Sequence, residues 1–201
     1  MIVGKWNRSV IVTYIGVVFS IVGMYFAFTN GTKYAMCCLM AAGICDLFDG
    51  RIARSCKRTE EEKRFGVELD SLADVFNFIS FPVVIFIGAG FTKPYFILLY
   101  ILFTICGIAR LAYFNISTED STPVRYYQGL PVTYTALILP IVYLLKYVLP
   151  SNLVYIIFPA ALFVTSILNI LNIKVPKPKG AAYILFSLSA VFVLVLYLVI
   201  L

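Results

Sequence analysis

Four aspartates stand at helical spacing inside apolar stretches of the chain. Asp46 and Asp49 are three residues apart near the end of one apolar segment, and Asp70 and Asp74 are four residues apart near the start of the next. Residues at these spacings share a helix face, so two adjacent helices can bring all four carboxylates together. We call these four residues the aspartate cluster. Its oxygens suit hard cations such as Mg²⁺, Mn²⁺ or Ca²⁺, and two such ions favour displacement at phosphorus.

Small residues and a cation accompany the acids in the same helical phase. Gly50 directly follows Asp49, and Ala53 lies one turn after it, so this face stays open for a ligand. Arg54 comes next and is suited to bidentate contact with phosphate. Gly66 lies one turn before the second aspartate pair and can play the same part as Gly50. Carboxylates, small residues and an arginine in this order predict a site for a diphosphate.

The composition indicates an integral membrane protein. The chain has 201 residues, of which 62% are hydrophobic and 13% charged, and its mean hydropathy is +0.96. Soluble domains carry about 25% charged residues. We therefore expect one membrane-embedded domain over residues 1–201, with its motif core at 46–74. The chain has no histidine, which excludes Ser-His catalysis and His-ligated zinc and leaves a carboxylate as the candidate general base.

The apolar segments predict an all-α polytopic helix bundle. At about 20 residues per span, the sequence divides into about seven transmembrane helices, with six or eight also possible. The predicted spans are 9–29, 34–54, 66–90, 94–115, 130–148, 153–172 and 180–200. The first is too long for a cleaved signal peptide and lacks a small-residue cleavage site.

Basic residues gather at alternate connections between these spans. They are Lys5, Arg8, Arg51, Arg54, Lys57, Arg58, Lys63, Arg64, Arg125, Lys174, Lys177 and Lys179. The positive-inside rule then places the N-terminus and the aspartate cluster on the cytoplasmic side of the cell membrane, and seven spans leave the C-terminus outside. The net charge of +6 suits contact with anionic lipid. A nucleic-acid partner is not expected, because these cations lie at membrane ends rather than on one soluble face.

The segment 55–65 is the most charged part of the chain. The simpler interpretation is a solvated cytoplasmic loop. The functional interpretation is that some of its cations help to hold an anionic headgroup.

The motif as a whole resembles the signature of the CDP-alcohol phosphotransferases. The pattern is D-x-x-D-G-x-x-A-R, then G-x-x-x-D-x-x-x-D, and all of its positions are present: Asp46, Asp49, Gly50, Ala53, Arg54, Gly66, Asp70 and Asp74. The eleven residues between Arg54 and Gly66 are more than is usual in that family. This difference weakens any transfer of roles within 55–65 and leaves the helical positions unaffected.

The resemblance implies a membrane homodimer that uses two divalent cations, Mg²⁺ or Mn²⁺, held by the four aspartates. It implies that Asp74 is also the general base. The implied donor is CDP-diacylglycerol or a CDP-archaeol-type lipid, with cytidine near Gly50 and Ala53 and CMP as product. Thr13 is a further candidate for contact with the diphosphate, although a Thr in a span often bonds its own helix backbone.

A second stretch concerns the acceptor. Arg110 lies inside or near the end of an apolar span, where an arginine usually faces a cavity and pairs with an anion, or else reaches back to the interface. In a cavity it would bind the acceptor's carboxylate or the donor's phosphate. The combination of R-L-A-x-F-N with a later G-L-P resembles the phosphatidylserine synthase branch, which implies L-serine as acceptor. Asn115 and Gln128 are secondary candidates for polar contacts with serine.

Other functions remain open at this point. Glycerol 3-phosphate or an inositol phosphate would need more cavity cations than Arg110 alone in the later spans. An intramembrane prenyltransferase also uses paired Asp motifs, but it usually has a longer Asn/Asp-rich first motif. A cation channel or transporter would use the carboxylates as an ion path and would need polar residues deep in several spans.

Overall fold

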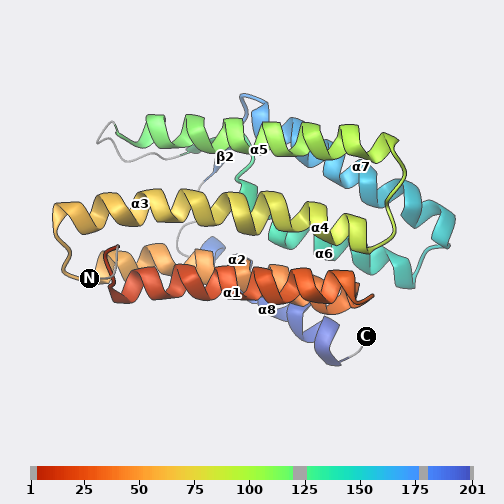
Figure 1. The fold of residues 1–201 in the computed structure, drawn as a ribbon, viewed down its shortest axis with the longest axis horizontal. Helices are drawn as coiled ribbons and strands as arrows, with labels where there is room; N and C mark the ends of the chain where they lie inside the picture. The colour runs from red at the N-terminus through yellow and green to blue at the C-terminus, as the bar shows by residue number, and fades with distance from the viewer. Residues whose placement is uncertain (1–3, 120–125, 177–180, 200–201) are drawn as a thin grey trace.

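The computed structural model describes residues 4–119, 126–176 and 181–199, and its helices run along one long axis (Figure 1). Arg125, Lys177 and Lys179 lie outside these residues. The α-helices are α1 (Arg8–Phe28), α2 (Thr32–Ser55), α3 (Glu60–Asp74), α4 (Phe81–Gly88), α5 (Tyr95–Glu119), α6 (Thr135–Leu144), α7 (Ser151–Ile170) and α8 (Ala181–Val199). The short elements are the π-helix η1 (Val75–Ser80), the 3-10 helices η2 (Val132–Tyr134) and η3 (Leu145–Tyr147), and the strands β1 (Tyr126–Gln128) and β2 (Lys174–Pro176).

Four helical runs in the described part of the chain are long and apolar enough to cross a membrane. They are Val10–Phe28, Glu60–Gly88, Tyr95–Ser117 and Ser151–Ile170. Two shorter apolar runs cover Val132–Tyr147 and Leu188–Val199. The prediction of an all-helical membrane protein is confirmed, and seven spans and a dimer stay predictions.

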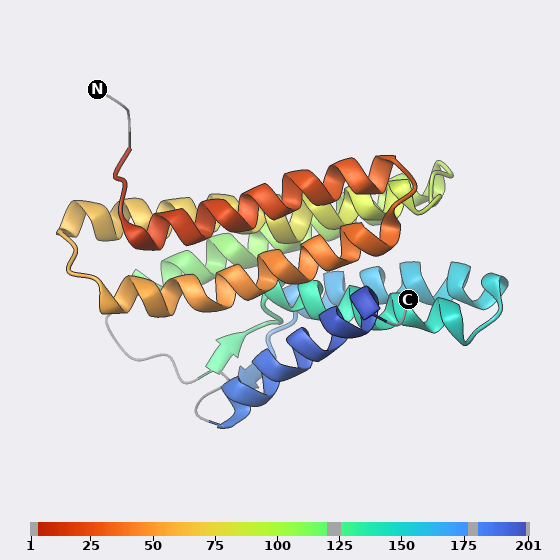
Figure 2. The same cartoon turned by 90° about the horizontal axis from the view of Figure 1, so that it is seen from below.

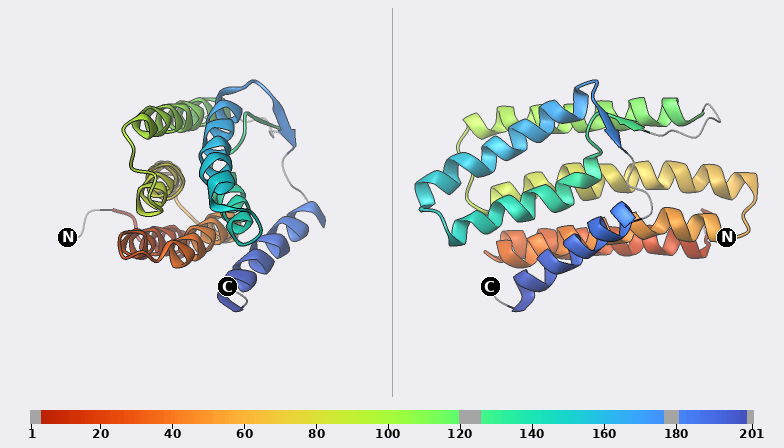
Figure 3. Two further views of the ribbon diagram at one scale, coloured as in Figure 1. Left: turned by 90° about the vertical axis from the view of Figure 1, so that its right-hand side faces the viewer. Right: turned by 180° about the vertical axis from the view of Figure 1, so that it is seen from behind.

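The helices pack in layers around α2. Helix α1 lies along α2, and α6 and α8 also pack on α2, while α5 packs on α7 (Figures 1 and 2). Seen end-on, α3–α4 lies between the α1–α2 pair and α5, and α6 and α7 close the side (Figure 3). Helix α8 runs obliquely across the outside of the bundle (Figure 2). This arrangement places the second half of α2 and all of α3 near one end of the bundle.

A π-helical turn joins α3 to α4 without breaking the helix. The N–H of Phe81 donates to the carbonyl of Phe76, five residues earlier, and Pro82 follows with no N–H to donate. The wider turn changes the helical register directly after Asp74. Such turns are frequent at functional sites.

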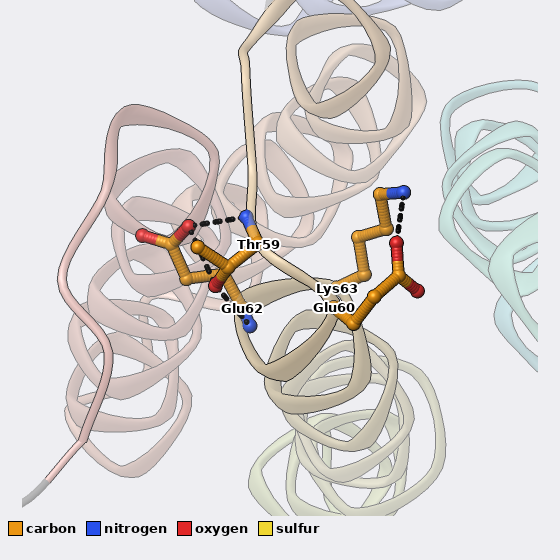
Figure 4. A network of polar contacts seen from close by, with 4 residues as sticks. All are labelled: Thr59, Glu60, Glu62 and Lys63. Carbon is orange, nitrogen blue, oxygen red and sulfur yellow. Dashed lines mark hydrogen bonds and ion pairs between the residues drawn. The ribbon is translucent and has the colours of Figure 1, made fainter.

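Helix α3 begins six residues earlier than the predicted span, so the expected charged loop is shorter. Thr59 accepts a hydrogen bond from the N–H of Glu62 at 3.2 Å, and the Glu62 carboxylate accepts from the N–H of Thr59 at 2.7 Å (Figure 4). Lys63 also pairs with Glu60 at 2.7 Å. This capping box satisfies donors at the helix start and makes the acidic run the first turn of α3.

Two short strands were not predicted from the sequence. Strands β1 and β2 pair antiparallel, with Tyr127 opposite Val175. Gly129, at φ +74°, donates its N–H to the carbonyl of Ile173, and Leu130 donates to Leu168. These bonds fasten the segment after α5 to the end of α7.

Aromatic side chains fill the opposite end of the bundle, where α4 ends and α7 begins. Phe86 and Phe158 are fully buried and stack with ring centroids 4.1 Å apart. Phe91 stacks on Tyr155 at 4.7 Å. We call these four residues the aromatic cluster.

Candidate active site

The aspartate cluster comes together as its spacing predicts. One carboxylate oxygen from each of Asp46, Asp49 and Asp70 lies within 4.8 Å of the others. The carboxyl group of Asp74 interacts with that of Asp46. All four side chains line one small central cavity between α1, α2 and α3.

Residues of α1 and η1 support this cluster. Thr13 donates its hydroxyl to Oδ2 of Asp49 at 3.0 Å, so this hydroxyl orients a carboxylate of the cluster. Ser20 donates to Oδ1 of the buried Asn77 at 2.7 Å, and Asn77 lines the central cavity. The sequence analysis missed Ser20 and Asn77. Ser20 lies two helical turns after Thr13, on the same face of α1, and this spacing is the sequence signal that could have identified it.

The residues predicted to bind the donor line one cavity of about 190 Å³, which we call the α1–α3 cavity. Its lining includes Thr13, Gly50, Ala53, Arg54 and Gly66, together with Asp49, Asp70 and Arg58. The residues predicted to bind the CDP-lipid come from α1, α2 and α3, and in the fold they lie together beside the carboxylates.

A second cavity, of about 210 Å³, lies on the other side of α2, and we call it the α2–α6 cavity. Asp46, Arg54 and Tyr127 line its polar part, while Met40 and Ala190 belong to its apolar part. Arg54 also lines the α1–α3 cavity, and its side chain therefore lies between the two cavities.

Arg110 is buried, with 6% of its surface exposed. Its guanidinium lies 5.0 Å from the ring of Phe114 and 5.9 Å from that of Tyr127. Asp74 and Asp46 are the carboxylates whose charges act on it. Its buried Nε has no hydrogen-bond partner among the described residues. A buried cation of this kind is suited to an anionic group of a ligand.

The other two acceptor candidates lie in different surroundings. Gln128 lines a third cavity of about 330 Å³ together with Arg110 and Asn169, which we call the α5–α7 cavity. Asn115 instead donates to the hydroxyl of Ser71 on α3 at 2.8 Å and is not part of that lining. Asn169 was missed from the sequence, and it joins the cavity only through the packing of α7 on α5.

The cluster fits a divalent cation on the chemistry of its donors. Three carboxylate oxygens converge within 4.8 Å, and a fourth carboxylate adjoins them. An all-oxygen set of this kind suits Mg²⁺ or Mn²⁺. Asp46, Asp49 and Asp70 could each offer one oxygen to such an ion, and Asp74 lines the same central cavity.

Comparison with known proteins agrees with this geometry. A family model described as CDP-alcohol phosphatidyltransferase matches residues 6–173. The chain is 32% identical over 180 residues to a CDP-diacylglycerol–serine O-phosphatidyltransferase of Helicobacter pylori, covering 83% of this chain and 74% of the relative.

Two other relatives are matched over smaller shares of their length. A protein of the same name from Saccharomyces cerevisiae is 38% identical over 112 residues, which are 52% of this chain and 40% of the yeast protein. The archaetidylserine synthase of Methanothermobacter thermautotrophicus is 30% identical over 153 residues, 75% of this chain and 62% of the relative. The family match covers α1 to α7 and the whole aspartate cluster, and the chain belongs to the CDP-alcohol phosphatidyltransferase family.

Proposed function

We propose that this protein transfers a phosphatidyl group from a CDP-linked lipid to the hydroxyl of L-serine and releases CMP. The observation that carries the proposal is the contact between the α1–α3 cavity and the aspartate cluster, with Arg110 on the far side of that cluster. A nucleotide-linked donor and a small anionic acceptor can therefore approach the same carboxylates from opposite sides. Relatives named for serine transfer, including an archaeal one, support this choice.

The family uses divalent metals, and we propose that Asp46, Asp49, Asp70 and Asp74 hold two ions, Mg²⁺ or Mn²⁺. When bound, such ions neutralise charge that develops on the diphosphate. Thr13 orients Asp49 for this task through its 3.0 Å hydrogen bond. Gly50, Ala53 and Gly66 leave room for the nucleotide, and Arg54 pairs with the phosphates.

We propose that Asp74 acts as the general base. The charge of Asp74 acts on Arg110, our candidate for binding the acceptor, which supports this assignment. Asp74 accepts the proton of the serine hydroxyl, and the serine oxygen forms a bond to the lipid-linked phosphorus. The bond from this phosphorus to the bridging oxygen breaks, and CMP leaves with that electron pair. A positioned base typically contributes about 10²–10⁴-fold to the rate.

Arg110 is our candidate for the serine carboxylate. Gln128 lines the same α5–α7 cavity, and Asn115, which is bonded to Ser71, is the weaker candidate. A phosphorylated acceptor would require further cations near Arg110. Lys146, a cation of the later helical region, instead donates to the hydroxyl of Tyr143 at 2.8 Å in a different part of the fold. One buried arginine suits the single carboxylate of a zwitterion.

The membrane placement follows the charge pattern. The exposed cations Arg51, Lys57 and Lys63 lie at the end of the bundle that holds the aspartate cluster. The positive-inside rule places this end, and the N-terminus, at the cytoplasmic face of the cell membrane. We also propose a homodimer, as the family resemblance implies.

The deciding measurement is CMP release from CDP-diacylglycerol by the purified protein, with serine or glycerol 3-phosphate added. We expect release with serine, loss of release with a chelator, and recovery when Mg²⁺ or Mn²⁺ is restored. A parallel assay with a CDP-archaeol-type donor determines the lipid preference. Release that depends on glycerol 3-phosphate and not on serine would show that the proposed acceptor is wrong. Ion flux through vesicles without any CMP would favour a transporter instead.

A further inference from the structure

Arg58 lies in the short connection between α2 and α3, outside the family signature. The structure places it in the lining of the α1–α3 cavity, together with Arg54 and Asp49. The connection belongs to the segment that is longer than is usual in the family, so the resemblance assigns no role to Arg58. Its position therefore requires a separate explanation.

The contacts of Arg58 leave its charge available to the cavity. Its Nη1 would lie 3.3 Å from a Cβ built on Gly66, so the guanidinium occupies the space that this glycine leaves open. Its Nε is buried and has no hydrogen-bond partner among the described residues. The nearby ion pairs join Lys63 to Glu60 and Lys5 to Glu61, and neither engages Arg58.

The backbone beside Arg58 is held in place. Thr59, the next residue, is the N-cap of α3 and shares the two reciprocal bonds of the capping box with Glu62 (Figure 4). The 2.7 Å pair between Lys5 and Glu61 ties the start of α3 to the segment before α1, and the Glu61 carboxylate raises the pKa of Lys5. A cation on such a fixed support loses less conformational freedom when it binds an anion.

We infer that Arg58 is a second diphosphate-binding arginine, which acts with Arg54 on the CDP end of the donor. This inference rests on the proposed function. The diphosphate of a CDP-lipid carries two negative charges, and Asp49 and Asp70 cannot neutralise them without cations. Two guanidinium groups on the same cavity supply matching charge and directed N–H donors.

The test compares Arg58→Ala with Lys57→Ala. Lys57 is exposed, belongs to the same connection, and is not part of the cavity lining, so its loss removes the same charge without the contact. We expect Arg58→Ala to raise the KM for CDP-diacylglycerol by roughly 10- to 100-fold, the range for hydrogen bonds to charged groups. The KM for serine at saturating donor should be unchanged. Lys57→Ala should change neither constant by more than about twofold, as for surface charges.

Binding of CDP, measured calorimetrically with Mg²⁺ present, gives a readout that does not depend on turnover. Arg58→Ala should weaken CDP binding, and Arg58→Lys should restore part of it. Equal effects of Arg58→Ala and Lys57→Ala would overturn the inference in favour of general surface charge. Unchanged CDP binding in a stably folded Arg58→Ala protein would also overturn it. If Arg58→Ala does not fold, the same comparison is made with Arg58→Gln.

The inference and the proposed function can fail separately. If the wild-type protein binds CDP but releases no CMP with serine, the acceptor assignment fails and the role of Arg58 can still be measured. If serine transfer occurs and Arg58→Ala retains the wild-type KM for the donor, only the role of Arg58 fails.

Discussion

The two ends of the helix bundle differ in how their interiors are filled: one contains charged groups and cavities, and the other is packed with aromatic side chains. At one end, α1, α2 and α3 enclose the carboxylates and a cavity of about 190 Å³, and a second cavity of about 210 Å³ lies between α2 and α6. At the other end, α4 and α7 close on the aromatic cluster, where Phe86 and Phe158 are fully buried. The first end gathers like charges, which oppose folding, and the second has dense packing, which favours it. We therefore expect substitutions at the aspartate end to change activity more than stability, and the reverse at the aromatic end.

The largest effect is expected from Asp74→Asn. Loss of the proposed base should lower kcat by about 10²–10⁴-fold. The substitution also removes one of four like charges that lie together, so stability should be equal or higher. CMP release and thermal unfolding of the same preparation provide the measurement.

Asp49→Asn is the comparison for this prediction. It should weaken donor binding more than Asp74→Asn does, because Asp49 lines the α1–α3 cavity and receives the hydrogen bond from Thr13. Near-normal turnover of the Asp74→Asn protein would show that its assignment as base is wrong.

The aromatic end is tested by Phe158→Ala. A buried Phe replaced by Ala leaves a cavity and typically costs about 3–5 kcal/mol. The free energy of unfolding in detergent should fall by that amount, while turnover at low temperature should persist because the aspartate cluster is distant. Phe163→Ala, which is on the same helix but 50% exposed, should change stability little. Equal losses in the two variants would mean that the aromatic cluster does not stabilise the bundle through packing.

The aspartate end could be predicted from the sequence because its information is local. Helical periodicity alone places Asp46 beside Asp49 and Asp70 beside Asp74, and the structure brings both pairs together. Asp46 and Asp49 also make α2 less apolar, and α2 is not one of the four helical runs that are long and apolar enough to cross a membrane. The acidic run before Gly66 was expected to be loop, although Thr59 and Glu62 carry the spacing of a capping box.

Other features could not be predicted because they depend on packing between distant segments. Whether Arg110 faces a cavity or the interface depends on where Tyr127 and α7 lie, and only the assembled fold places them. The β1–β2 pair is three residues long on each side, too short for an alternating pattern to identify it.

An intermediate effect is expected where the β1–β2 pair joins the acceptor side. A Cβ on Gly129 would collide with the carbonyl oxygen of Asn169, and Gly129 has a φ of +74°. Gly129→Ala should cost about 1–3 kcal/mol of stability, the usual range for a strained backbone position. Displacement of Tyr127 from Arg110 should also raise the KM for serine.

Gly90→Ala is the control that separates backbone strain from a steric clash of the added Cβ. Gly90 has a φ of +93°, and a Cβ there would meet nothing within 4 Å. This variant should lose some stability and leave the KM for serine unchanged. A wild-type KM for serine in the Gly129→Ala protein would show that the strand pair does not position Tyr127 for the acceptor.

The smallest effect is expected from Thr59→Ala, at the edge of the aspartate end. Loss of an N-cap hydroxyl costs about 1 kcal/mol. Because Thr59 adjoins Arg58, the KM for CDP-diacylglycerol should rise slightly as well, whereas a purely structural cap would change stability alone. Ser55→Ala is the matched control, since its hydroxyl donates to the carbonyl of Ile52 and caps no helix start. If the two variants unfold at the same temperature, the capping box does not stabilise α3, and the fixed support assigned to Arg58 is lost with it.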